Sequence, residues 1–220
     1  MPEIDTTADG VQVTGYLAAP DGAKAGMIVI QEWWGLNDDI RAIADRYAAE
    51  GYVAIAPDLY HGTLASEPDE AQKLMGALDR NLASREIDAA ISYLKSQHGV
   101  TKVGVVGFCM GGGLTLAAAA RPTSTADAAH AYYGVPFLSP DELATVHCPV
   151  MASFGGEDAF TPADQITALE QGLTAAGVEN DVKVYEGAGH GFFNSGGGHH
   201  EAAAADSWER AMSWFGRHLA

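Results

Sequence analysis

The chain has 220 residues, of which 29 are acidic and 12 basic, giving a formal net charge of −17. So negative a chain disfavours nucleic acid or an anionic membrane surface as a partner, and no apolar run approaches the ~20 residues that span a bilayer. The first five residues show no signal peptide and the sequence holds two cysteines, which together predict a cytoplasmic protein with reduced thiols.

Seven strands are predicted from short apolar or β-branched runs. They lie at residues 11–18, 27–31, 52–56, 102–106, 128–133, 149–154 and 182–185. In the first of them, apolar and polar residues alternate, which predicts an edge strand.

Helical patterns separate these strands. Asn37 is a predicted N-cap of a helix that Gly51 closes, and Ser84 is the predicted N-cap of the next helix. Between them, the weakly patterned stretch to about Asn81 is typical of a lid or pocket wall. Later helices are expected after residue 110, from 161 or 164 to about 176, and around 208–215. The alternation predicts one α/β domain over residues 1–220, a mostly parallel sheet covered by helices on both faces.

The motif Gly107-Phe108-Cys109-Met110-Gly111 lies between an apolar run and an Ala/Leu-rich segment. A strand, a sharp turn and a helix with a nucleophile at the bend form a nucleophile elbow. Gly107 and Gly111 fit this geometry, because a Cβ there would clash with the crossing strand and helix. The N–H of Met110, at a helix N-terminus, favours a thiolate and an oxyanion. The alternative is a buried structural cysteine.

Two later strand ends supply a candidate base and acid. Asp158 follows a Gly-Gly turn, and His190 lies in a Gly-x-Gly-His-Gly segment after the last predicted strand. Nucleophile, acid and histidine follow one another in the order of α/β-hydrolases. Glu157 remains an alternative to Asp158, and His190 could instead be a surface-loop histidine.

Six segments, each at an expected strand end and in the expected order, resemble the dienelactone hydrolase (carboxymethylenebutenolidase) family of α/β-hydrolases. They are Gln31–Gly35, Ala56–Tyr60, Gly107–Gly112, Tyr132–Gly134, Gly155–Asp158 and Ala188–Phe192. The resemblance covers nearly the whole chain. It implies an α/β-hydrolase fold and a hydrolase of a small-molecule ester or enol-lactone, with Cys109 as nucleophile, His190 as base and Asp158 as its partner.

The resemblance also implies a role for Glu32. In the family, this glutamate contacts the thiol in the resting enzyme and helps to generate the thiolate when substrate displaces it. The alternative is a glutamate held by backbone N–H groups at the adjacent helix start. The backbone N–H groups of Trp33 and Met110 would form the oxyanion hole.

The resemblance fails where the substrate is bound. Characterised family members hold a substrate carboxylate with two arginines, one in the lid region and one four residues after the catalytic histidine. Here the second position is Asn194, and residues 60–73 contain no arginine. The sequence therefore predicts a substrate other than the dienelactone and a more apolar or aromatic pocket. The candidate pocket residues are Trp34, Tyr60, Tyr133, Phe160, Phe193 and Asn194. A core position is the alternative for each of the aromatic residues, and Arg80 or Lys73 could take the place of the missing arginines.

Two other functions stay open. One is an aryl or alkyl esterase, or a thioesterase, built on the same residues. The other is a non-hydrolytic redox sensor in which Cys109 pairs with Cys148, although Cys148 is predicted to be a core residue. We expect no metal, because His199-His200-Glu201 lacks the i, i+4 histidine pair of zinc hydrolases, and no cofactor.

Overall fold

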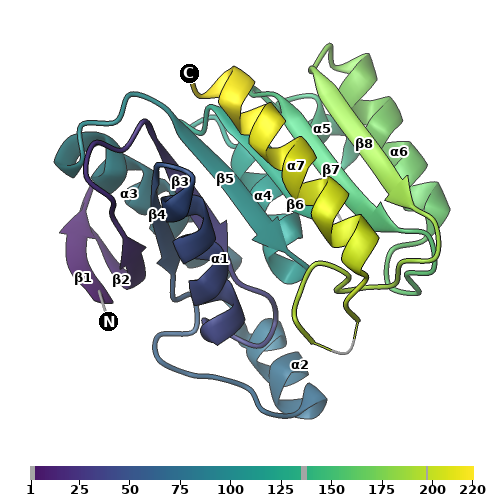
Figure 1. Ribbon diagram of the computed structural model, residues 1–220, viewed down its shortest axis with the longest axis horizontal. Helices are drawn as coiled ribbons and strands as arrows, with labels where there is room; N and C mark the ends of the chain where they lie inside the picture. Colours follow the sequence, from purple (N-terminus) through teal and green to yellow (C-terminus); the bar gives the residue numbers. More distant parts are fainter. Residues whose placement is uncertain (1–2, 135–137, 197) are drawn as a thin grey trace.

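One eight-stranded sheet runs through the computed structural model, which describes residues 3–134, 138–196 and 198–220 (Figure 1). Its strands are β1 (Glu3–Ala8), β2 (Val11–Ala18), β3 (Ala25–Ile30), β4 (Tyr52–Pro57), β5 (Val103–Phe108), β6 (Ala128–Tyr132), β7 (Val150–Gly155) and β8 (Asn180–Tyr185). Their order across the sheet is β1-β2-β4-β3-β5-β6-β7-β8. The pairs β1–β2 and β2–β4 are antiparallel and the other neighbours are parallel. The structure confirms the predicted mostly parallel sheet.

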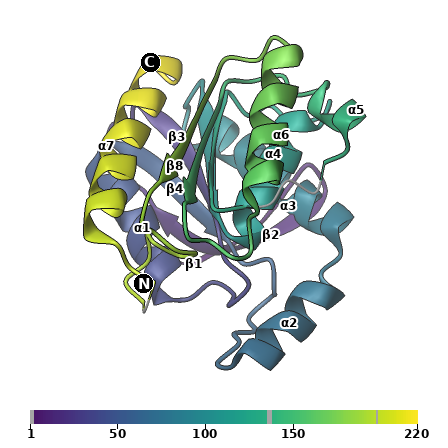
Figure 2. The same ribbon diagram turned by 90° about the vertical axis from the view of Figure 1, so that its right-hand side faces the viewer.

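Helices cover both faces of this sheet. One face carries α1 (Asp38–Ala49) and α7 (Glu201–His218), and the other carries α3 (Arg80–Gln97), α4 (Met110–Ala120) and α6 (Ala163–Ala175), as Figures 1 and 2 show. Strands β3 to β7 are buried along their whole length, as expected for parallel strands covered on both sides. The apolar core therefore consists of two clusters, one on each face of the sheet.

Strand β1 corrects the prediction that residues 11–18 form an edge strand. β1 pairs along the outer side of β2 through the turn Asp9-Gly10, in which both residues have positive φ (50° and 75°). An Asp-Gly pair of this conformation is typical of two-residue hairpin turns. β1 lacks an apolar run because it is itself the edge, and of its side chains Ile4 alone is buried.

The segment between β4 and α3 also differs from expectation. The predicted lid stretch contains a ten-residue helix, α2 (Pro68–Ala77), which has proline in its first turn and buries only Ala71. It lies apart from the two helical layers (Figures 1 and 2). The following helix begins at Arg80 and not at Ser84, because Asp79 accepts the N–H groups of Asn81 and Leu82 at 2.9 and 3.1 Å.

The predicted start of α1 is confirmed, since Asn37 Oδ1 accepts the N–H of Ile40 at 3.1 Å. A one-turn helix, α5 (Pro140–Leu143), which the sequence did not predict, precedes β7 and is held by a Ser139–Glu142 capping box. Within the described ranges, no helix is both long and apolar enough to cross a membrane.

Candidate active site

Cys109 lies at a strained bend between β5 and α4. Its backbone has φ 54° and ψ −117°, in the positive-φ region that residues other than glycine rarely adopt. A Cβ on Gly107 would overlap the carbonyl of Gly111, and one on Gly111 would lie 2.5 Å from the carbonyl oxygens of Ile30 and Gln31. The two glycines thus allow strand, turn and helix to cross as the elbow motif predicts.

The loops after β7 and β8 bring Asp158 and His190 together. His190 Nδ1 lies 2.8 Å from Asp158 Oδ2, and Asp158 Oδ1 accepts the N–H of Phe160 at 2.8 Å. Burial on its own would raise the pKa of Asp158. The hydrogen bond and charge of His190 and the hydrogen bond from the Phe160 N–H have the opposite effect and are stronger, so the pKa of Asp158 is lowered. The rival Glu157 is exposed, so Asp158 is the carboxylate that faces the histidine.

The imidazole of His190 also faces Cys109. His190 interacts electrostatically with the Cys109 side chain, and because Asp158 occupies Nδ1, Nε2 is the ring nitrogen left for the thiol. Burial would lower the pKa of His190, but the hydrogen bonds with Asp158 and Cys109 outweigh burial and raise the pKa to about 10. The arrangement favours the imidazolium form of His190.

Two aromatic rings flank the histidine. The rings of Tyr133 and Phe160 each have their centroid 5.0 Å from that of His190, at interplanar angles of 62° and 59°. Tyr133 is fully buried, whereas Phe160 is 68% exposed. These rings restrict the rotation of the imidazole, and Phe160 shields it on the solvent side.

Glu32 is a buried carboxyl group two residues after β3, with 6% of its surface exposed. The side chains of Asn194 and Tyr133 lie near it and oppose the effect of burial on its pKa, and Tyr133 Oη donates to Asn194 Oδ1 at 3.1 Å. Burial raises the pKa of Glu32, and the opposing effects of Asn194 and His190 do not restore it. Sequence reasoning placed Tyr133 and Asn194 in the pocket but missed them as neighbours of Glu32. Contact between Glu32 and the thiol stays a prediction.

The two amides expected to form an oxyanion hole lie on neighbouring backbone segments. Met110 is the first residue of α4, and the first N–H groups of a helix have no acceptor within it. Trp33 follows the end of β3, whose carbonyls at Ile30 and Gln31 lie against Gly111. Both backbone segments therefore lie beside Cys109.

The predicted pocket residues lie in different surroundings. Tyr60 Oη donates to Met110 Sδ at 3.4 Å, and burial, together with the charge of Cys109, raises the pKa of Tyr60 to about 12. Trp34 is half-buried, and its carbonyl accepts the N–H of Ala65 at 3.0 Å, which ties the lid segment to the loop after β3. Tyr60 therefore lies beside the elbow.

Phe193, a predicted pocket residue, packs among apolar core side chains. It is 7% exposed and stacks on Phe108, with ring centroids 5.4 Å apart at 29°. It also packs against Tyr132 and Trp208, with centroids 4.7 and 6.2 Å away. Phe193 is thus part of the core between the sheet and α7, and its place in the pocket stays a prediction.

The structure also overturns the disulfide of the redox-sensor alternative. Cys109 follows the carboxyl end of β5, and Cys148 precedes the amino end of β7, a strand that runs parallel to β5 in the same sheet. A six-residue strand spans about 20 Å, far beyond disulfide reach. Cys148 is 5% exposed, and burial raises its pKa to about 12, as expected for a core thiol.

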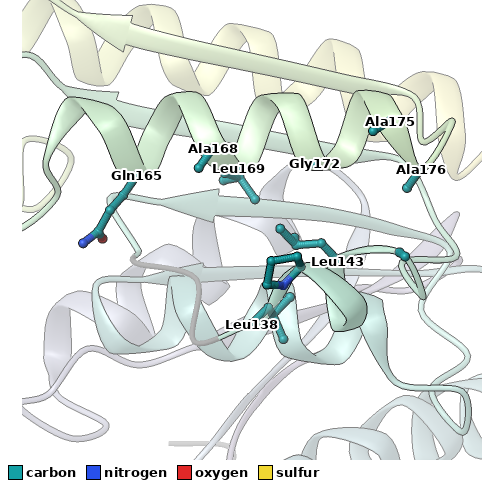
Figure 3. A pocket seen from close by; sticks show the side chains of 10 residues that line it. Leu138, Leu143, Gln165, Ala168, Leu169, Gly172, Ala175 and Ala176 are labelled. Atoms are coloured by element: carbon teal, nitrogen blue, oxygen red, sulfur yellow. The ribbon is translucent and has the colours of Figure 1, made fainter.

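The remaining motif residues have structural partners. His200 Nδ1 accepts the N–H of Ala203 at 3.2 Å and caps α7, and His199 Nδ1 pairs with the carbonyl of Asn194 at 3.0 Å. An apolar cavity of about 560 Å³ lies between α5 and α6, lined by residues such as Leu143, Leu169 and Gly172 (Figure 3). None of its lining residues belongs to the predicted site.

Comparison with known proteins identifies the family. Residues 13–219 match the model of the dienelactone hydrolase family. The chain is 34% identical to "Protein usf" of Aquifex pyrophilus and 32% identical to a protein of Aquifex aeolicus named "Putative carboxymethylenebutenolidase", with 98% of each chain covered in both cases. It is also similar to a crystal structure named "Putative Dienelactone Hydrolase" from Klebsiella pneumoniae, with a TM-score of 0.82, 30% identity and 98% and 97% of the two chains covered.

The family model covers the chain from within β2 to beyond the end of α7. The predicted α/β-hydrolase fold is thereby confirmed. The chain belongs to the dienelactone hydrolase family.

Proposed function

We propose that this hydrolase of carboxylic esters or lactones works through a thioester acyl-enzyme on Cys109. The observation that carries the proposal is the position of His190, whose Nδ1 lies 2.8 Å from Asp158 Oδ2 and whose ring interacts electrostatically with the Cys109 side chain. A base held between an acid and a nucleophile is the arrangement that nucleophilic acyl transfer requires.

In the acylation step, the thiolate of Cys109 attacks the substrate carbonyl carbon and a C–S bond forms. The carbonyl oxygen becomes an oxyanion, which the backbone N–H groups of Trp33 and Met110 stabilise. When the C–O bond breaks, the His190 imidazolium gives its proton to the leaving oxygen. In a lactone this oxygen stays attached to the acyl group.

In the deacylation step, His190 acts as base. It takes a proton from a water molecule as the water oxygen bonds to the acyl carbon, and the C–S bond then breaks. The carboxylic acid leaves, and Cys109 and His190 return to the thiolate–imidazolium pair. Asp158 stabilises the charged imidazole in both steps.

The residue at position 194 favours uncharged substrates. Asn194 occupies the place where the family carries an arginine for the substrate carboxylate, and it faces Glu32 and Tyr133. An amide cannot replace the charge-assisted hydrogen bonds of a guanidinium. Because a thiolate is itself a good leaving group, the expected substrates are activated neutral esters, such as aryl or enol esters, and neutral enol-lactones.

Hydrolysis of p-nitrophenyl acetate by Cys109→Ala tests this assignment. We expect a loss of kcat of at least 10³-fold with the fold intact, because removal of a nucleophile leaves only the binding contribution. The matched control is Cys148→Ala, which removes the other thiol of the chain and is expected to hydrolyse the ester at the wild-type rate. Equal activity of Cys109→Ala and Cys148→Ala would contradict the proposal.

A further inference from the structure

Tyr60 lies between the two backbone segments that carry the proposed oxyanion-hole amides. On one side, its Oη donates a hydrogen bond to Sδ of Met110, the first residue of α4, at 3.4 Å. On the other side, its ring lies against the loop after β3, since a Cβ added to Gly35 would be 3.4 Å from Tyr60 Cδ2. Gly35 belongs to the same short loop as Trp33. One side chain therefore bridges the start of α4 and the loop after β3.

The backbone that carries this side chain is held by two further hydrogen bonds. The N–H of Tyr60 donates to Asp58 Oδ1 at 3.1 Å, and the N–H of Leu59 donates to Oε1 of the fully buried Gln31 at 3.2 Å. The carbonyl oxygen of Gln31 in turn lies 2.5 Å from a Cβ placed on Gly111. The end of β3, the turn after β4 and the first turn of α4 are thus packed together around Tyr60.

The hydroxyl contact fixes the ring more than apolar packing does. A cavity of about 250 Å³ lies between the turn after β4, α2 and α3, and Tyr60, Leu74 and Leu82 are among the residues that line it. Burial, together with the charge of Cys109, raises the pKa of Tyr60 to about 12, so the hydroxyl keeps its proton at neutral pH. Methionine is flexible and its thioether is a weak acceptor. A donor on the sulfur therefore restricts the side chain of Met110.

We propose that Tyr60 is a positioning residue of the oxyanion hole. Its hydroxyl holds Met110, and its ring keeps the start of α4 at a fixed distance from the loop of Trp33. This matters because the donors of an oxyanion hole act only when they lie about 2.7–3.1 Å from the position of the developing charge. The reaction does not pass through the hydroxyl itself. The inference rests on the proposed function, because it takes these two amides as the hole.

Nuclear magnetic resonance tests the contact without turnover. The methyl groups of the six methionines are labelled with ¹³C, and Met110→Leu identifies the signal of Met110. Tyr60→Phe deletes the hydroxyl but keeps the ring, so this signal is expected to move. The matched control is Tyr16→Phe, which removes the hydroxyl that a similarly buried tyrosine donates to Asp45 at 2.6 Å, between β2 and α1. A Met110 signal that stays in place in Tyr60→Phe, or moves equally in both variants, would overturn the proposal.

A double-mutant cycle tests the effect on catalysis. With p-nitrophenyl acetate, Tyr60→Phe and Met110→Leu are each expected to lower kcat by about 3- to 10-fold, the size of one hydrogen bond. KM is expected to stay unchanged, because an oxyanion hole binds the transition state and not the ground state. The combined variant is expected to lose no more than the weaker single variant, since both changes break one contact. Losses that multiply, a change in KM alone, or wild-type kcat in Tyr60→Phe would overturn the proposal.

The carbonyl atom of the substrate provides a readout that a general loss of packing would not change. In the thiono analogue of p-nitrophenyl acetate, sulfur replaces the carbonyl oxygen and is a poorer acceptor for the hole. The ratio of kcat/KM for the ester to that for the thiono ester is expected to fall in Tyr60→Phe and to stay at the wild-type value in Tyr16→Phe. Full activity of Cys109→Ala would refute the proposed function. An inactive Cys109→Ala with an unchanged ratio in Tyr60→Phe would refute only the role of Tyr60.

Discussion

The carboxylate of Asp158 lies 2.8 Å from the imidazole of His190 although 32 residues separate them in the chain. The two residues follow β7 and β8, which are neighbours in the sheet. The carboxyl ends of parallel strands share one edge of a sheet. The same edge carries Cys109 after β5, so topology alone assembles the three side chains.

Asp158→Asn tests the role of this carboxylate. The amide keeps the shape but not the charge that favours the imidazolium, so kcat for p-nitrophenyl acetate is expected to fall by about 10³- to 10⁴-fold. Steady-state kinetics measures the loss. Glu157→Gln, at the adjacent exposed position, is the control and is expected to keep the wild-type kcat. If kcat falls in Glu157→Gln and is unchanged in Asp158→Asn, then Glu157, and not Asp158, is the carboxylate that supports His190.

The raised pKa of His190 predicts a specific pH dependence of stability. Its folded pKa of about 10 lies above the ordinary value of 6.5. The protonated histidine therefore contributes its full stabilisation below about pH 6.5, and this stabilisation is lost as the pH rises through about 10. Urea unfolding of wild type and His190→Gln across this range is expected to show a difference in free energy of unfolding that shrinks with pH. A difference that grows with pH would contradict the pairing with Asp158 and Cys109.

Substitution of Gly111 at the elbow is expected to destabilise the fold. In Gly111→Ala the new Cβ would lie 2.5 Å from two backbone carbonyl oxygens, which cannot move without displacing β3. We expect a loss of at least about 3 kcal/mol in the free energy of unfolding, measured by urea unfolding. In Gly216→Ala nothing lies within 4 Å of the new Cβ, and the helix α7 is expected to gain up to about 1 kcal/mol. Similar free energies of unfolding for the two variants would contradict the close packing of Gly111 against β3.

Position 194 is expected to set the preference between neutral and anionic substrates. Asn194→Arg restores the charge that the family places there, and one charge-assisted hydrogen bond is worth about 1.5–3 kcal/mol. The ratio of kcat/KM for a monoanionic aryl ester to that for its neutral counterpart is therefore expected to rise at least about tenfold. An unchanged ratio would show that Asn194 does not face the acyl group.

The main strands and the elbow could be predicted from the sequence because their signals are local. The apolar run of β5 followed by Gly107 and Gly111 specifies strand, turn and helix within twelve residues. The positions of Asp158 and His190 after later strands then follow from parallel topology. β1 was missed because an edge strand carries few apolar residues.

The neighbours of Glu32 could not be predicted because they depend on tertiary packing. Glu32, Tyr133 and Asn194 come from three loops, and no spacing in the chain links them. The neighbouring Phe193 shows the same limit. The sequence groups it with Asn194 as a pocket residue, yet Phe193 packs in the core, whereas Asn194 contacts Tyr133.

The trapped acyl-enzyme tests the central claim most directly. Wild-type protein is mixed with p-nitrophenyl acetate, quenched in acid during the first turnover, digested and examined by mass spectrometry. We predict one acetyl group on the peptide that contains Cys109 and none on the peptide that contains Cys148. Turnover with the acetyl group on a different residue, or with no acetylated peptide when deacylation is rate-limiting, would contradict the thioester mechanism.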